Sequence, residues 1–210
     1  MKVILVNGSP HEKGCTYTAL EEVTKTLNAD GIDTEIFHIG TDPMAGCTAC
    51  YGCRKAGKCV YPGRVNDFLD IAGSADGFIF GSPVHYASAG GAITSFMDRV
   101  FYANMMSGRN LFSFKPAAAV VSARRAGTTA AFDQLNKYFT ISQMPVISSR
   151  YWNMVHGASP DDVRKDLEGL QVMRTLGRNM AWFLKCKEAG IKAGIKFPEQ
   201  EERVSTNFIR

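Results

Sequence analysis

The stretch Lys2-Val-Ile-Leu-Val-Asn-Gly-Ser-Pro-His-Glu-Lys-Gly-Cys-Thr-Tyr-Thr18 contains the elements from which the fold can be predicted. Residues 3–6 form an apolar run that predicts a buried strand, residues 7–14 have the composition of a turn, and residues 15–27 predict a helix. A buried strand that leads through a polar loop into a helix aims backbone N–H groups and hydroxyls at one point. The stretch therefore predicts an α/β fold that binds a phosphate group, although it has neither G-x-G-x-x-G nor G-x-x-x-x-G-K-[ST].

Composition indicates one domain of ordinary size. The chain has 210 residues with 45% hydrophobic content and no Pro/Ser-rich linker, so we expect a domain over residues 1–189 and a tail over residues 190–210. The 24 basic and 20 acidic residues are interspersed, which argues against a nucleic-acid partner and agrees weakly with an anionic cofactor. The start of the chain does not resemble a signal peptide, and no apolar run approaches ~18 residues. We therefore expect a cytoplasmic protein without a membrane partner.

Apolar runs alternate with helical patterns along the chain. Five alternations predict a parallel sheet with helices on both faces, because parallel neighbours need crossover connections. We expect a three-layer sandwich with a five-stranded sheet in the order 2-1-3-4-5 and ligands at the carboxyl ends of strands 1, 3 and 4. The predicted strands are residues 3–6, 34–39, 76–81, 117–121 and 144–148. The predicted helices are residues 15–27, 65–72, 92–102, 130–139 and 161–188, the last with Leu167 and Cys186 on its buried side.

Three polar loops follow strands 1, 3 and 4, and together they predict a flavin site. A hydroxyl-rich loop between a strand and a helix is typical of FMN phosphate sites, and Ser9, Thr16 and Thr18 would donate hydroxyls there. A simpler alternative makes Ser9 an ordinary helix cap. In the second loop Pro83, Val84, His85 and Tyr86 would lie against the flavin ring. In the third loop Arg124 or Arg125 would place positive charge beside the pyrimidine edge of the ring. The alternative for His85 and for the two arginines is plain exposure to solvent.

A cysteine-rich loop interrupts the chain between the second predicted strand and the next helix. The pattern Cys47-x-x-Cys50-x-x-Cys53-x5-Cys59 resembles the compact runs that hold a four-iron four-sulfur cluster. Zinc sites more often use two separated C-x-x-C pairs, and a third alternative treats these thiols as small apolar side chains under a loop. Disulfides are not expected in a reducing compartment.

Other residues leave two interpretations open. Cys15 at a helix start is either a reactive thiol of lowered pKa or a packing residue of the phosphate loop. Tyr151, Trp152 and His156 would wall a substrate pocket or form an interface between subunits. Met105 and Met106 have the same two interpretations.

Four segments carry a resemblance to a known family. They are Gly8-Ser-Pro-His11, Gly81-Ser-Pro-Val-His-Tyr86, Phe96-Met-Asp-Arg99 and the cysteine loop. With them the chain resembles the flavodoxin-like NADPH-dependent FMN reductase family, and the cysteine spacing resembles that of the archaeal and anaerobic iron-sulfur flavoproteins.

The resemblance implies specific residues and partners. It implies a flavodoxin-like fold, noncovalent FMN, and a homodimer or homotetramer with the flavin near the interface. The positions that match the family are Ser9, Cys15, Thr16 and Thr18 for the phosphate, residues 83–86 for the ring, and Ala123, Arg124, Arg125 and Gly127 for the pyrimidine edge. Two positions depart from the family: His11 stands where arginine is frequent, and His85 replaces a usual tyrosine.

Three functions follow as hypotheses. The first is an FMN-dependent NAD(P)H oxidoreductase that passes electrons from nicotinamide through flavin to a quinone, flavin, nitro or azo compound, with no obligatory acid or base. The second is an iron-sulfur flavoprotein that takes single electrons from ferredoxin through the cysteine loop. The third is a flavin-free α/β binding module.

Overall fold

The computed structural model describes residues 1–202, 204–206 and 208, so the prediction of a tail over residues 190–210 falls partly outside the described residues. Strands and helices alternate along the chain, as expected from the apolar runs. The strands are β1 (Lys2–Asn7), β2 (Asp33–His38), β3 (Gly77–His85), β4 (Ser88–Ala89), β5 (Ala117–Ala123) and β6 (Met154–His156). The helices are α1 (Cys15–Ala29), α2 (Cys53–Ala56), α3 (Arg64–Ala72), α4 (Gly91–Ser107), α5 (Thr128–Ile141), α6 (Pro160–Lys165) and α7 (Leu167–Lys192).

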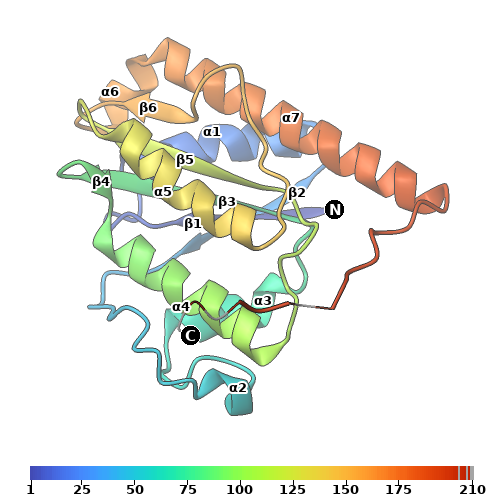
Figure 1. Ribbon diagram of the computed structural model, residues 1–210. Coiled ribbons are helices and arrows are strands. Elements are labelled where there is room, and N and C mark those ends of the chain that lie inside the picture. Colours follow the sequence, from blue (N-terminus) through green and yellow to red (C-terminus); the bar gives the residue numbers. More distant parts are fainter. Residues whose placement is uncertain (203, 207, 209–210) are drawn as a thin grey trace.

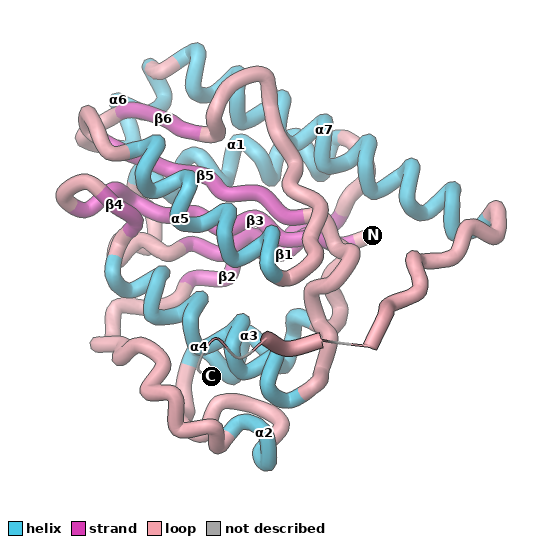
Figure 2. The backbone as a smooth tube through the Cα atoms, in the orientation of Figure 1, coloured by secondary structure: helices cyan, strands magenta, loops and turns pink. Residues whose placement is uncertain are grey.

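Five parallel strands form the central sheet in the order β2-β1-β3-β5-β6, and the two-residue β4 pairs antiparallel with the end of β3. Counted without β4, this is the predicted order 2-1-3-4-5. Figure 2 shows the strands in one layer with helices on both sides. The prediction of an α/β, flavodoxin-like three-layer sandwich is therefore confirmed.

The two faces of the sheet bury separate apolar layers because side chains alternate along each strand. In β1, Ile4 and Val6 join the layer under α3, α4 and α5, whereas Val3 and Leu5 join the layer under α1, α6 and α7. Figure 1 shows α1 and α7 together on one side of the sheet. Phe68 of α3 lies at the centre of the first layer, with its ring centroid 5.4 Å from that of Phe96 and 6.4 Å from that of Phe112.

The prediction of a fifth strand over residues 144–148 was wrong. Val146 forms only an isolated bridge with Ala117, and the strand that extends the sheet is β6, ten residues further on. Pro145 has no N–H to donate to a ladder, although its carbonyl accepts from Ala117 N at 2.9 Å. The segment therefore touches the sheet edge at one point and then leaves it.

The single helix predicted over residues 161–188 is two helices. Asp166 has φ −76° and ψ 77°, so it ends α6, and its carboxylate caps α7 by accepting from Gly169 N at 2.9 Å. The break shifts the helical phase, and Leu167 is 74% exposed rather than buried. Cys186 is also exposed, which corrects its assignment to the core. No helix of the described chain combines the length and apolarity needed to span a membrane.

Candidate functional site

The loop between β1 and α1 is closed by its own side chains. The Asn7 side chain accepts from Ser9 N at 3.1 Å and donates to Glu12 O at 3.0 Å. The Ser9 hydroxyl accepts from His11 N at 3.1 Å, which leaves the hydroxyl proton for another acceptor. Asn7 and Ser9 are both buried, so these hydrogen bonds fix the loop before any ligand is present.

The start of α1 presents N–H groups without acceptors. Gly14 is the N-cap and supplies no side-chain cap. In the part of the chain that the structure describes, no group accepts from the N–H of Cys15, Thr16 or Tyr17. Three free N–H groups and the positive end of the helix dipole suit an anion. The arrangement fits the phosphate of FMN, which is a dianion that backbone amides can bind.

The predicted hydroxyl donors of α1 have protein partners. Thr16 Oγ1 lies 2.8 Å from Ser122 Oγ at the end of β5, and Thr18 Oγ1 donates to Gly14 O at 3.2 Å. Both threonines are buried. Their roles as phosphate ligands stay predictions, and the geometry shows them connecting the loop to its surroundings.

Cys15 packs against the neighbouring turn. Its thiol donates to Gly157 O at 3.7 Å, and burial raises the pKa of the thiol above its usual value. Of the two interpretations of Cys15, the structure favours packing, because desolvation of the thiol exceeds the opposing effect of the backbone on its pKa.

Contacts between the three polar loops place them at one rim of the sheet. Gly8 N donates to Gly81 O at 2.9 Å, which joins the first loop to β3. The Thr16 contact with Ser122 joins the first loop to β5. A Cβ on Gly127 would lie 2.8 Å from Val84 Cγ1, so the third loop touches the second. The expected convergence of the loops at the carboxyl ends of the strands is confirmed.

The second loop is a continuation of β3 that turns back as a tight hairpin. Val84 pairs with Ala89 and His85 with Ser88. Pro83 and Val84 are half-buried, His85 is exposed, and Tyr86 at the tip is fully exposed with a left-handed φ of 57°. The hairpin therefore projects a polar and aromatic edge beyond the rim.

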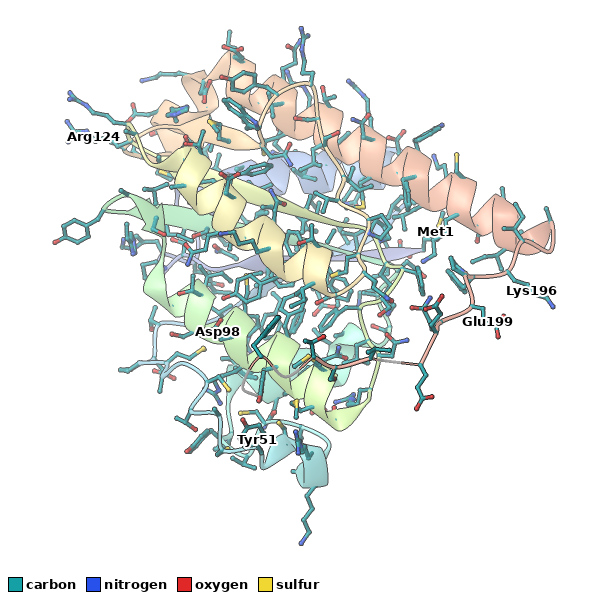
Figure 3. The ribbon with its side chains drawn as sticks, in the orientation of Figure 1. Met1, Tyr51, Asp98, Arg124, Lys196 and Glu199 are labelled. Carbon is teal, nitrogen blue, oxygen red and sulfur yellow. The ribbon has the colours of Figure 1, made fainter. Side chains whose placement is uncertain are left out.

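The third loop leaves β5 beside β6. Ala123 is buried, and its carbonyl accepts from Gly157 N at 3.0 Å. Arg124 and Arg125 are exposed and make no ion pair with any described residue. Figure 3 shows Arg124 pointing outward at the carboxyl edge of the sheet. Gly127 has a φ of 97°, a conformation that favours glycine, and precedes the first residue of α5.

Two exposed aromatic side chains lie ahead of β6. The ring centroids of Tyr151 and Trp152 are 4.9 Å apart, and each side chain is about half exposed. His156 at the end of β6 is exposed, with Nδ1 4.0 Å from Asp166 Oδ2. His156 is the member of this group at the carboxyl end of its strand.

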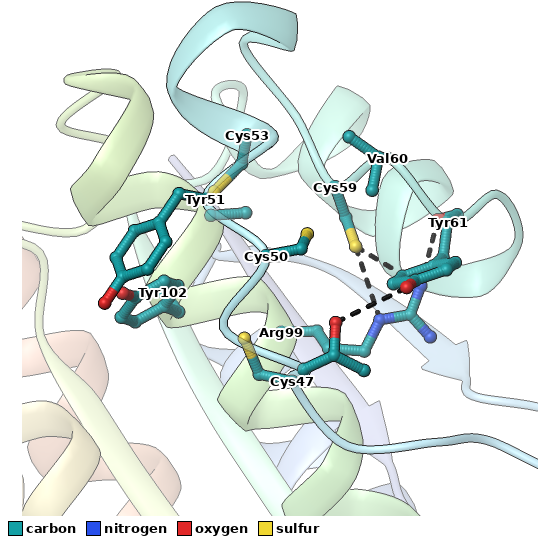
Figure 4. A pocket seen from close by; sticks show the side chains of 11 residues that line it. Cys47, Cys50, Tyr51, Cys53, Cys59, Val60, Tyr61, Arg99 and Tyr102 are labelled. Atoms are coloured by element: carbon teal, nitrogen blue, oxygen red, sulfur yellow. Dashed lines mark hydrogen bonds between the residues drawn. The ribbon is translucent and has the colours of Figure 1, made fainter.

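The cysteine loop and α4 enclose a pocket that is separate from the three polar loops. Cys47, Cys50, Cys53 and Cys59 all line one pocket, and Figure 4 shows their side chains around it. Cys53 opens the short helix α2 and is buried, which raises the pKa of its thiol. The cysteine-rich segment was predicted as a loop, and α2 is a short helix within it.

Sequence reasoning did not single out Arg99 for this pocket. The Arg99 guanidinium is buried and donates to Cys59 Sγ from Nε and Nη2, both at 3.4 Å, and to Tyr61 O at 2.9 Å. No carboxylate in the described chain pairs with it. Burying a cation without a carboxylate is costly, so the pocket suits a negatively charged occupant or thiolates. The signal in the sequence was an arginine close to the apolar residues Phe96, Met97, Val100 and Phe101 of the predicted helix.

The thiols are not arranged around a single ion. Within residues 1–202, 204–206 and 208, no three His, Cys, Asp or Glu side chains are placed to hold one metal ion. A four-iron cluster takes one thiolate on each iron, so its ligands stand farther apart than those of one ion. The four thiols line one pocket, and their assignment to an iron-sulfur cluster or to zinc stays a prediction.

A larger groove lies between α4, α5 and the C-terminal segment, with a volume of about 980 Å³. Tyr138 donates to the Asp98 carboxylate across it, and burial, followed by this hydrogen bond, raises the pKa of the tyrosine. Cys47, Phe101, Met105, Gln143 and Gln200 are among the lining residues. Cys47 and Tyr102 line both the groove and the cysteine pocket, so the two cavities are neighbours.

Comparison with known sequences identifies the class of protein. A sequence model of the NADPH-dependent FMN reductase family matches residues 1–159, and the chain belongs to that family. An iron-sulfur flavoprotein from Methanocaldococcus jannaschii is 29% identical over 197 residues, which covers 88% of this chain and 98% of that protein. An iron-sulfur flavoprotein from Clostridioides difficile is 33% identical over 129 residues, covering 60% of this chain and 56% of that protein.

Solved structures agree with the observed fold. A structure of RosB with bound 8-demethyl-8-formylriboflavin-5′-phosphate has a TM-score of 0.69 at 13% identity, over 100% of this chain and 92% of that one. An NAD(P)H:quinone oxidoreductase from Methanothermobacter marburgensis has a TM-score of 0.60 at 19% identity, over 86% of this chain and 96% of that one. At these identities the likeness concerns the fold.

Proposed function

We propose that this protein uses FMN to take electrons from NAD(P)H and pass them to a small acceptor such as a quinone, flavin, nitro or azo compound. The observation that carries the proposal is the set of unpartnered N–H groups at the start of α1, located where three polar loops meet. Family membership supports an oxidoreductase over the flavin-free binding module. The nicotinamide and the acceptor belong to the proposal.

Each loop has a task in holding the cofactor. The N–H groups of Cys15, Thr16 and Tyr17, with the Ser9 hydroxyl, would bind the phosphate. Backbone groups of residues 83–86 would orient the ring, and Arg124 or Arg125 would place positive charge beside its pyrimidine edge. When bound, FMN supplies hydride and electron transfer, and the protein binds and orients it without a dedicated acid or base.

The exposed hairpin also supports the proposal that the protein works as a homodimer or homotetramer. Tyr86 is a large apolar side chain in full contact with solvent at the rim, and such side chains are enriched in interfaces. Size-exclusion chromatography with light scattering tests the assembly, and a monomer at working concentration would contradict it.

The test of the main proposal is a spectrum and an assay. Protein purified gently without oxygen is expected to show flavin absorbance or to bind added FMN, and to oxidise NADH or NADPH when a quinone is supplied. Comparing the two nicotinamides at equal concentration identifies the donor. Protein that neither contains nor binds FMN would refute the proposal.

A second candidate function rests on the cysteine pocket. We propose that Cys47, Cys50, Cys53 and Cys59 hold a four-iron four-sulfur cluster that exchanges single electrons with an acidic carrier such as a ferredoxin. Four thiols line one pocket beside the unpaired cation of Arg99, and the matched relatives are named iron-sulfur flavoproteins. Arg54, Lys55 and Lys58 are exposed around the pocket and would attract an acidic partner.

Iron and sulfide analysis of anaerobically purified protein tests the second candidate. Iron and acid-labile sulfide in equal amounts, about four of each per chain, are expected for this cluster type. Zinc, or no metal, after anaerobic preparation would contradict it. The result does not depend on flavin, so the two candidates can be judged separately.

A further inference from the structure

The loop between β1 and α1, residues 8–14, is called the phosphate loop below. The last paired residues of strands β1 and β2 form hydrogen bonds to its backbone. Asn7 and His38 lie side by side at the carboxyl ends of these strands. Asn7 holds the N–H of Ser9 and the carbonyl of Glu12, as described above. His38 Nε2 lies 2.8 Å from Ser9 O, so the two side chains together bind three backbone groups of the loop.

The His38 contact identifies a ring nitrogen that carries a hydrogen. A carbonyl oxygen only accepts hydrogen bonds, so Nε2 of His38 carries the proton that it donates to Ser9. The backbone of His38 is fixed in turn, because the Arg64 guanidinium donates to His38 O from Nε at 3.1 Å and from Nη2 at 2.5 Å. Arg64 also lies over the Phe37 ring, 4.0 Å from its centroid. The half-buried imidazole therefore has a defined place and direction.

We propose that His38 is a positioning residue for flavin phosphate binding. By drawing the Ser9 carbonyl toward β2, it turns that oxygen away from the start of α1, where an anion would bind. A carbonyl oxygen beside a phosphate dianion would be repulsive, and the amides of residues 15–17 would have to compensate for it. The proposal rests on the proposed FMN function and assigns to β2 a role that its short β-branched and aromatic pattern does not indicate.

A positioning role of His38 and a simple packing role predict different effects on the binding of FMN and riboflavin. Loss of a packing residue would lower the stability of the whole domain and would weaken the binding of FMN and riboflavin equally. Loss of the carbonyl contact would weaken only the ligand that carries a phosphate. Riboflavin has the same ring as FMN without the phosphate, so the ratio of the two dissociation constants measures the contribution of the loop.

The test compares substitutions of His38 in the full chain. In His38→Leu the ratio of FMN to riboflavin dissociation constants is expected to rise about 3- to 10-fold, the effect of one hydrogen bond. The amide nitrogen of glutamine can take the place of Nε2, so His38→Gln should restore the wild-type ratio. Asparagine is one methylene shorter, and His38→Asn should behave as the leucine variant does while keeping a polar side chain if leucine prevents folding.

The matched control is Thr34→Val at the other end of β2, where Thr34 Oγ1 donates to Asn28 Oδ1 at 2.8 Å. It removes a side-chain hydrogen bond from the same strand and should leave the ratio unchanged. If His38→Leu weakens the binding of FMN and riboflavin equally, the ratio of their dissociation constants is unchanged. That result would overturn this inference and leave the proposed function standing. A wild-type chain that binds neither flavin would overturn the proposed function and the inference with it.

Discussion

The phosphate loop and the cysteine loop lie on the same chain and are built in opposite ways. The phosphate loop is short, follows a buried strand, and has its backbone groups bound by Asn7, Ser9 and His38. The cysteine loop runs from the end of β2 to α3 with only the four-residue helix α2 inside it. Ala49 and Tyr51 adopt left-handed φ values of 52° and 58°, which are uncommon for residues with side chains.

The difference shows how the type of ligand relates to the type of scaffold. Backbone amides at a helix start bind an anion through dipoles that any sequence supplies, so the phosphate loop needs accurate backbone placement and few special side chains. Thiolate ligation depends on side-chain identity, so an irregular backbone suffices if the cysteines face one pocket. Changes to backbone geometry should therefore affect ligand binding mainly at the phosphate loop. Replacement of the cysteine side chains should affect ligand binding mainly at the cysteine loop.

The largest expected effect is that of a single cysteine substitution on the proposed cluster. Cys50 is exposed on the loop, so Cys50→Ser should abolish bound iron and sulfide while the flavin content and the fold persist. Metal analysis and flavin absorbance of anaerobic protein measure both. Cys186→Ser, also exposed but remote in sequence, is the control and should keep its iron. If Cys50→Ser loses flavin as well, the two regions are not independent.

A side chain on Gly8 should disable the phosphate loop. A Cβ there would lie 2.6 Å from Ile93 Cβ and 2.7 Å from the Gly81 carbonyl oxygen, and the latter belongs to a central strand that cannot yield. Gly8→Val should therefore abolish FMN binding and lower the free energy of unfolding by about 2–3 kcal/mol.

Urea unfolding and flavin titration check the Gly8 prediction. Gly73→Ala is the matched control, since its Cβ would meet only Leu111 Cδ2 at 3.8 Å. The control should keep FMN affinity. Unimpaired FMN binding by Gly8→Val would show that the close approach of the loop to β3 is not needed.

Arg99→Gln should weaken the cysteine region and leave the phosphate loop intact. The substitution removes the positive charge and the Nε and Nη2 donors that contact Cys59 and Tyr61. We expect the free energy of unfolding to fall by about 1–3 kcal/mol, the usual effect of hydrogen bonds from a charged group. The FMN dissociation constant should stay within about twofold of wild type, since the residues to which Arg99 donates, Cys59 and Tyr61, belong to the cysteine loop. Urea unfolding and flavin fluorescence titration measure the two quantities. A large loss of FMN affinity would contradict the separation of the regions.

The smallest expected effect concerns pH at the turn beside the phosphate loop. The Asp162 carboxylate accepts from Ser159 Oγ at 3.0 Å and from Ser159 N at 3.2 Å, and these hydrogen bonds lower the pKa of Asp162 below its usual 3.8. A lowered pKa means that the ionised form stabilises the fold. That contribution is complete above pH 3.8 and is lost as the pH falls through the lower, folded-state value.

Thermal melting of Asp162→Asn between neutral pH and about pH 2 tests this sign. The melting temperature of the variant should lie slightly below that of wild type at neutral pH, and the gap should close as the solution becomes more acidic than pH 3.8. A gap that widens in acid would show that the carboxylate has no stabilising role when ionised.

The sheet could be predicted from the sequence because buried parallel strands are short apolar runs between turns. Four of the five parallel strands lie where the runs are. The fifth prediction failed because residues 144–148 have the same apolar character as a strand. β6 has only two apolar residues, Met154 and Val155, with Asn153 before them and His156 after them. Periodicity within so few residues cannot distinguish an edge strand from an apolar segment that crosses the sheet end.

The residues of the candidate flavin site could be predicted where they belong to a recognisable local sequence motif. Ser9, Pro83 and Gly127 lie on loops whose composition indicates turns at strand ends, so their convergence followed from the topology. His38 and Arg99 act across the fold, and nothing in their neighbouring residues indicates which backbone group or thiol they contact. A pattern within one segment cannot report a partner that only the tertiary structure brings close.

The contact between His38 and Ser9 joins residues 29 positions apart. During synthesis the segment around Ser9 emerges first and cannot adopt its final shape until β2 has been made and has docked beside β1. On the proposed function, FMN uptake requires β1, β2, β3 and β5 to have assembled, because each contributes a contact at the rim, so the quenching of free FMN fluorescence would report the assembled sheet.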